Sequence, residues 1–219
     1  MKELFKKILV VLPVLLLTLL YLKDHYREEY RHAGIERLLL FAATLLILYG
    51  WIVISVFIWK QRTAFSLLLQ SSFFVYVFMV LTLTGYFILF REISSHGWWN
   101  NMRLRIRQED HVNLTPFQIF KIYKLSDKQV VGNFIMLLPL GIYLPLLYNR
   151  LNNFFLVLLL SLLVSLTIEL LQLATRFRSA DVDDVILNTS GSLLGFALFK
   201  LAGVFRSPQQ VGAPAVESS

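Results

Sequence analysis

The stretch that decides the fold is NFFLVLLLSLLVSLTIELLQLA, residues 153–174, in which Glu169 is the only charged residue. A helix that crosses the hydrocarbon core of a bilayer needs about 20 mostly apolar residues, each adding about 1.5 Å. Residues 153–174 have that length, and Glu169 and Gln172 interrupt an otherwise apolar run. The stretch therefore predicts a transmembrane helix.

The composition extends this prediction to the whole chain. Hydrophobic residues make up 57% of the sequence, whereas about 45–50% is usual for soluble domains. The absence of cysteine excludes disulfides, thiolate metal sites and a catalytic thiol. The net charge of +7 is scattered between apolar runs, which is typical of loops that face anionic headgroups rather than of a nucleic-acid-binding patch. The lipid bilayer is thus the first expected partner, and no nucleic acid is expected.

Five further apolar runs flank residues 153–174, at 8–22, 38–59, 66–90, 131–148 and 182–204. The predicted fold class is all-α: a polytopic transmembrane helical bundle of six spans, or of five if residues 8–22 form an interfacial helix instead. Pro139 and Pro145 are expected to kink their span, which membrane helices tolerate. Ser126 and Gln129 predict a capping box before it.

The chain divides into three predicted regions. Residues 1–37 are an N-terminal span and a charged linker, residues 38–204 are the main transmembrane domain, and residues 205–219 are a disordered tail rich in Pro, Gln, Gly and Ser. Lysine and arginine are more numerous on the side of the long loop, residues 91–130, which places that side in the cytoplasm by the positive-inside rule. The three N-terminal lysines and the acids of residues 23–37 favour the opposite orientation, so the sequence leaves sidedness open.

Counting the crossings brings four segments to one membrane face: the long loop, the start of the span at 131, the end of the span at 174 and the start of the span at 182. This result does not depend on orientation or on the first span. The polar residues of the C-terminal half gather at this face, namely Asn133, Glu169, Gln172, Arg176, Arg178, Asp181, Asp183, Asp184 and Asn188.

Glu169 is the strongest single candidate for function. A carboxylate within a membrane helix costs several kcal/mol unless it is paired, so a functional role is the default interpretation. Gln172 lies three residues further on and shares its helix face. A structural ion pair with Arg176 or Arg178 is the alternative.

The last span opens with three acids. Asp181 is either a functional residue or an N-cap, and the helix dipole favours Asp184 near the helix start. Asp183 and Asp184 are weak candidates for a hard cation such as Mg²⁺; no other metal and no cofactor is expected. Asn188 shares the stripe of Asp184, and Gly191 and Gly195 continue that stripe in a small-xxx-small pattern typical of close helix packing.

Five motifs follow one another along the chain: Asn113-Leu-Thr-Pro116-Phe117, Gly132-Asn133, Pro139-Leu-Gly141, Ser165-x-x-x-Glu169-Leu-Leu-Gln172 and Arg178-x-x-Asp181-x-Asp183-Asp184-Val-x-x-Asn188-Thr-x-Gly191-x-x-x-Gly195. In this order and spacing they resemble the VanZ-like family of bacterial membrane proteins, over residues 37 to 202. The resemblance implies a multi-pass plasma-membrane protein of Gram-positive type. It also implies a link to lowered susceptibility to teicoplanin-type glycopeptide antibiotics, and it adds Asn113, Pro116 and Phe117 to the expected site.

Three functions remain in view. The expected one is non-enzymatic: the protein reduces glycopeptide action at the cell surface, by shielding a lipid-linked wall precursor or by weakening the docking of a lipidated antibiotic. The second is a membrane enzyme that acts on a lipid-linked intermediate, with Glu169 as a general base activated by burial and Asp183 and Asp184 binding a cation or orienting substrate. The third is a transporter in which Glu169 carries a proton, although no inverted repeat is visible. The oligomeric state is left open.

Overall fold

The computed structural model describes residues 2–25, 35–57, 64–86, 98–107, 112–122, 124, 126–173 and 179–204. Its elements are helical apart from two very short strands, which confirms the all-α prediction. They are α1 (Lys2–His25), α2 (Ile35–Phe57), α3 (Ala64–Leu83), α5 (Trp98–Arg107), β1 (Val112–Asn113), α6 (Ile119–Ile122), α7 (Lys128–Met136), α8 (Leu138–Leu147), the 3₁₀ turn η3 (Asn149–Leu151), α9 (Phe154–Leu173), β2 (Ala180–Asp181) and α10 (Val182–Val204).

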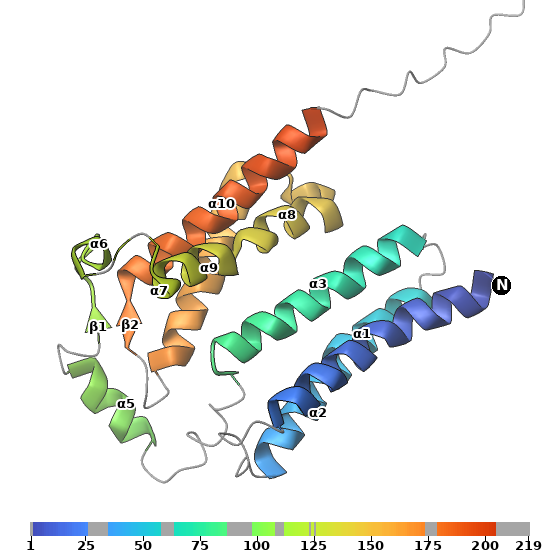
Figure 1. The fold of residues 1–219 in the computed structure, drawn as a ribbon, viewed down its shortest axis with the longest axis horizontal. Helices are drawn as coiled ribbons and strands as arrows, with labels where there is room; N and C mark the ends of the chain where they lie inside the picture. Colours follow the sequence, from blue (N-terminus) through green and yellow to red (C-terminus); the bar gives the residue numbers. More distant parts are fainter. Residues whose placement is uncertain are drawn as a thin grey trace, which may run out of the picture.

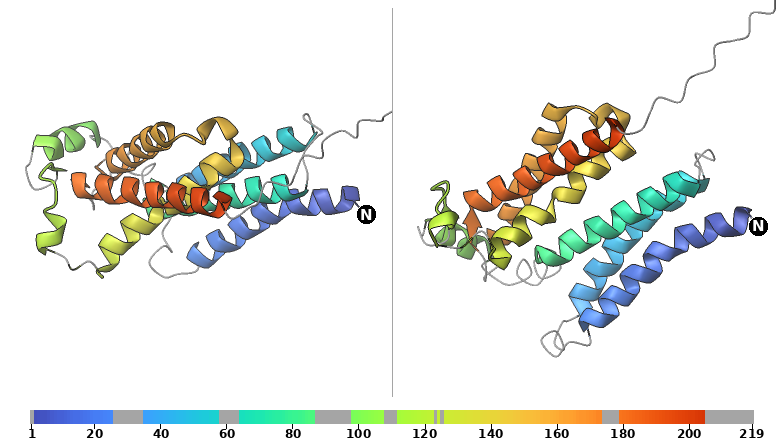
Figure 2. Two further views of the ribbon diagram at one scale, coloured as in Figure 1. Left: turned by 90° about the horizontal axis from the view of Figure 1, so that it is seen from above. Right: turned by 45° about the horizontal axis from the view of Figure 1, so that its top comes forward.

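The long helices form two groups (Figure 1). α1, α2 and α3 lie side by side, and α10 lies against α7, α8 and α9. α3 joins the groups: the Tyr76 hydroxyl donates to the Met136 carbonyl at 2.9 Å, and the Tyr76 ring stacks on Tyr143 with centroids 5.7 Å apart. Two further views show the long helices running in one general direction, as in a bundle that crosses a bilayer (Figure 2).

Four stretches are long and apolar enough to cross a membrane: Ala64–Leu83, Lys128–Leu147, Phe154–Leu173 and Val182–Gly203. α2 contains a shorter apolar helix, Phe41–Ile54. The bilayer-facing side of α9 leaves large apolar side chains exposed, among them Phe155, Leu159, Leu162, Leu163, Leu166 and Leu170. The chain is therefore a membrane protein. A crossing by residues 8–22 stays a prediction, although these residues form part of a continuous helix.

Helix boundaries differ from expectation where backbone geometry overrides composition. The run at 66–90 was expected to be helical throughout, but the helix is interrupted after Leu83, where Gly85 takes a positive φ of 78°. Residues 87–90 of this run lie outside the described residues. The span at 131–148 is divided at Leu137 into α7 and α8, with Pro139 in the first turn of α8. The predicted capping box is wrong: α7 begins after Asp127, not after Ser126.

α10 is the centre of the second group, and three glycines let its backbone approach that of α7 and α8. A Cβ on Gly191 would overlap the Phe134 carbonyl oxygen, and one on Gly195 would overlap the Leu138 carbonyl oxygen. Gly141 on α8 is equally close to the Ser192 carbonyl. The glycine stripe is therefore a packing surface, as its spacing indicates.

The ends of the helices also follow the crossing count. The start of α7, the end of α9, the start of α10 and the elements α5, β1 and α6 lie at one end of the bundle, away from the start of α1 and the end of α10 (Figure 1). The expected tail, residues 205–219, and most of the charged linker lie outside the described residues.

Candidate functional site

Two short strands bring the long loop to the start of α10. β1 pairs in parallel with β2, with Val112 opposite Ala180 and Asn113 opposite Asp181. The Asn113 side-chain amide donates to both carboxylate oxygens of Asp181, at 3.2 and 3.1 Å, and its own carbonyl oxygen accepts from the Thr115 backbone N–H at 3.0 Å. Asn113 thus turns the chain and fastens it to α10.

Asp183 holds the next part of the same loop. Its carboxylate accepts hydrogen bonds from the backbone N–H groups of Phe117 and Ile119, the latter at 2.7 Å, and the residue is only 1% exposed. Phe117 has a φ of 66°, a left-handed conformation that costs about 1–2 kcal/mol for a residue with a Cβ. The two hydrogen bonds and the burial of Ile119 against Val130 and Leu187 hold the loop in this conformation.

Glu169 supports this arrangement from α9. It is 5% exposed, and its Oε2 accepts from the Asp181 backbone N–H at 3.1 Å. The Asp181 Oδ1 in turn accepts from the Asp183 N–H at 2.9 Å, which is the geometry of an N-cap. Asp181 therefore caps α10 and binds Asn113 at the same time, and Glu169 positions the residue that caps the helix.

A second set of polar contacts joins α9 to α10 deeper in the bundle. The Asn188 side-chain amide donates to Ser165 Oγ at 3.0 Å, and Ser161 Oγ donates to Ser192 Oγ at 2.6 Å. Ser161, Ser165 and Ser192 are fully buried, and Asn188 is 1% exposed. Ser161 and Ser192 were not expected in the site. Ser161 lies four residues before Ser165, and Ser192 lies four residues after Asn188, a spacing that could have identified them.

The other predicted site residues divide into three groups. Gln172 and Asp184 are buried beside the acids already described. Asn133 is half-buried on α7, and Pro116 is exposed on the loop. Arg178, like Arg176, lies outside the described residues, so the alternative of an ion pair with Glu169 stays a prediction.

Backbone donors dominate the electrostatics of the site. Asp181 and Asp183 lie at the start of α10, where the helix dipole favours negative charge, and N–H groups of Phe117, Ile119, Asp181 and Asp183 point at carboxylates. Across the described part of the chain, no group of three or more His, Cys, Asp or Glu residues is placed to hold a metal ion. Since backbone donors occupy both oxygens of Asp183, this residue is a poor cation ligand.

An apolar groove lies on the other side of α9, between α3, α8 and α9. Its volume is about 350 Å³, and its walls include Phe73, Val77, Leu81, Leu140, Val164 and Leu171. Ile168 lines the groove and is adjacent in sequence to Glu169, whose side chain contacts β2 instead. The groove and the Glu169 carboxylate thus lie on opposite faces of one helix.

Comparison with known proteins identifies relatives for the part of the chain that contains this site. The family model described as VanZ/LLP1 matches residues 73–203, which begins later than the resemblance expected from residue 37. Protein VanZ of Enterococcus faecium is 31% identical over 91 residues, which cover 42% of this chain and 53% of that protein. The match thus spans about half the length of that relative. No solved structure matches the chain.

Proposed function

Since the chain belongs to the VanZ/LLP1 family, we propose that it is a multi-pass protein of a bacterial plasma membrane that lowers susceptibility to teicoplanin-type glycopeptide antibiotics at the cell surface. The proposed action is non-enzymatic. A surface at one membrane face meets the lipid-linked wall precursor or the lipidated antibiotic and weakens their encounter.

The observation that carries this proposal is the loop at residues 113–119, which the acids of the site hold in place. Asp181 and Asp183 bind its two ends, so these carboxylates are used to fix a surface rather than left free for chemistry. Between them, Leu114 is 75% exposed and Phe117 is 59% exposed. Exposed apolar residues on a rigid loop at a membrane face are typical of a binding surface for an amphiphile.

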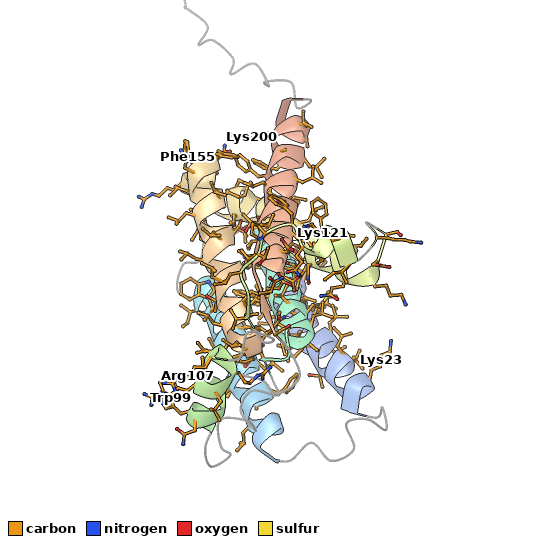
Figure 3. The ribbon with its side chains drawn as sticks, turned by 90° about the vertical axis from the view of Figure 1, so that its left-hand side faces the viewer. Lys23, Trp99, Arg107, Lys121, Phe155 and Lys200 are labelled. Carbon is orange, nitrogen blue, oxygen red and sulfur yellow. The ribbon has the colours of Figure 1, made fainter. Side chains whose placement is uncertain are left out.

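The test is a susceptibility assay in cells that express the native protein, an empty vector or a variant, with membrane levels checked by immunoblot. Phe117→Asn removes the exposed ring but keeps a residue that tolerates positive φ. Phe155→Asn is the matched control, because Phe155 is also well exposed, at 75%, and lies at the opposite end of the bundle (Figure 3). We expect Phe117→Asn to lose protection against a lipidated glycopeptide and Phe155→Asn to keep it.

Two results would contradict the proposal. If native protein and empty vector give equal susceptibility to every glycopeptide tested, the chain has no resistance function. If Phe117→Asn and Phe155→Asn protect equally at equal membrane level, the 113–119 loop is not the surface that acts.

A second candidate function is a membrane enzyme that acts on a lipid-linked intermediate. The specific observation in its favour is the buried Glu169 on α9, a helix whose opposite face lines a groove that would accept an apolar chain. Glu169→Gln separates the two functions, because the glutamine oxygen can still accept from the Asp181 N–H but cannot take up a proton. The non-enzymatic function predicts that protection survives this change, whereas the enzyme predicts that it is abolished.

A further inference from the structure

α5 is a short amphipathic helix with a strong positive charge and little packing of its own. Its sequence, WWNNMRLRIR, contains three arginines and no acid. No other described helix or strand packs extensively against it. A ten-residue helix is marginal in water by itself, so α5 needs a partner surface that the described parts of the chain do not supply.

The side chains of α5 are arranged as they are in interfacial helices. Trp99, Met102 and Ile106 are spaced on one stripe, and Trp99 and Ile106 are 56% and 54% exposed. Arg103 and Arg107 follow Trp99 at intervals of four residues and form the neighbouring stripe. The Arg103 guanidinium lies 5.5 Å from the centroid of the Trp99 ring. Arginine beside exposed tryptophan and isoleucine suits the boundary between headgroups and acyl chains.

The position of α5 agrees with this interpretation. It runs across the direction of α10, beside the end of α9 and the start of α10 (Figure 1). Trp99 and Arg107 project from the bundle at the same end as Lys23, whereas Phe155 and Lys200 lie at the opposite end (Figure 3). α9 is about 30 Å long by its 20 residues, the thickness of a hydrocarbon core, so the end of α9 lies near a headgroup layer.

We propose that α5 lies in the headgroup layer on the side of the 113–119 loop, where Arg103 and Arg107 bind the phosphates of anionic phospholipids. Charge complementarity selects this partner, because arginine binds phosphate through paired N–H donors. It also argues against a second copy of the chain, since two α5 helices face to face would repel each other. This inference concerns a surface that the proposed antibiotic function does not use.

The absence of cysteine in the chain permits a direct test. Ile106→Cys carries an environment-sensitive fluorophore, and the full-length protein is placed in nanodiscs of phosphatidylcholine alone or of equal parts phosphatidylcholine and phosphatidylglycerol. We expect the probe to report an apolar environment in the anionic discs and a wetter one in the zwitterionic discs. Replacing both Arg103 and Arg107 by glutamine should remove this difference, since each basic residue near such a surface contributes about fivefold to docking.

The matched control is the double variant Arg150→Gln/Lys200→Gln, which removes two exposed charges. Lys200 lies at the end opposite α5 (Figure 3), and Arg150 on η3 directly precedes the start of α9, where Phe155 marks the same end. It should respond to anionic lipid as the native chain does, and the melting temperature of each variant confirms folding. Three results would overturn the proposal: a probe that is equally wet in both discs, a probe that is equally buried in both, or burial that requires two protein copies per disc. The last would indicate a protein contact instead of a lipid one.

Discussion

At the scale of single residues, Asp183 has the most demanding position. Its buried carboxylate accepts two backbone N–H groups from the 113–119 loop. In Asp183→Asn one of these donors would face an amide NH₂ instead of an oxygen. Because hydrogen bonds to charged groups contribute more than neutral ones, we expect a loss of about 2 kcal/mol in the free energy of unfolding. Hydrogen exchange of the Phe117 and Ile119 amides should accelerate.

The control for this prediction is Asp127→Asn. Asp127 also accepts a backbone N–H, from Lys124 at 2.8 Å, but the bond closes a local exposed turn. It should change stability little. Equal exchange of the loop amides in Asp183→Asn and native protein would show that Asp183 does not hold the loop.

Asn113 gives a second prediction at this scale, because its amide donates to both oxygens of Asp181. Asn113→Ala removes the donor and should cost about 1 kcal/mol of stability. Asn113→Asp places a second carboxylate against the first and should cost more at neutral pH, since like charges repel. The melting temperature of Asn113→Asp should therefore lie below that of Asn113→Ala at neutral pH. Equal melting temperatures of the two variants would contradict the contact.

At the scale of elements, the sequence predicts helices better than it predicts what joins them. α10 begins and ends where expected, because Asp181 caps it and its apolar length matches a span. The break after Leu83 was not predicted, since the composition stays apolar through the glycine turn. The pairing of β1 with β2 was not foreseen at all: two-residue strands have no periodicity, and their contact joins residues 68 positions apart.

The candidate site shows the same limit: the sequence predicts where its residues lie better than it predicts the contacts between them. The crossing count correctly brought Asn113 to the face where Asp181 and Asp183 lie, because topology alone decides which helix ends share a membrane face. It could not show which donors would meet each acid. Asp183 was considered as a cation ligand, but it binds backbone N–H groups of a loop about 65 residues earlier in the chain, and no local pattern in the sequence encodes that contact.

The packing of α10 supplies the prediction that belongs to elements. Gly195→Ala would drive a Cβ into the Leu138 carbonyl and force α8 away, so we expect a loss of about 1–3 kcal/mol. Gly203→Ala is the control on the same helix, since nothing lies within 4 Å of a Cβ there. It should be neutral or slightly stabilising, because alanine has the higher helix propensity. Equal melting temperatures of the two variants in detergent would contradict the close approach.

At the scale of the whole molecule, the arrangement of the helices predicts which sites share a membrane face. Leu114 is exposed on the 113–119 loop, and Arg150 is exposed on η3, in the connection between α8 and α9. Since the chain has no cysteine, Leu114→Cys and Arg150→Cys can each be the only thiol. A membrane-impermeant maleimide should label only one of them in intact cells, and the other only after the cells are opened.

The proposed function also predicts which one is labelled. A surface that meets antibiotic or wall precursor must face outward, so Leu114→Cys should react in intact cells. By the positive-inside rule, the distribution of lysine and arginine places this face in the cytoplasm instead. That rule counts only basic residues, and the acidic residues near this face offset part of its positive charge. Anionic phospholipid bound by α5 would compensate the positive charge of the arginines near this face, whichever side of the membrane the face occupies. If Arg150→Cys reacts in intact cells instead, the bundle keeps its topology, but direct shielding at the cell surface is excluded.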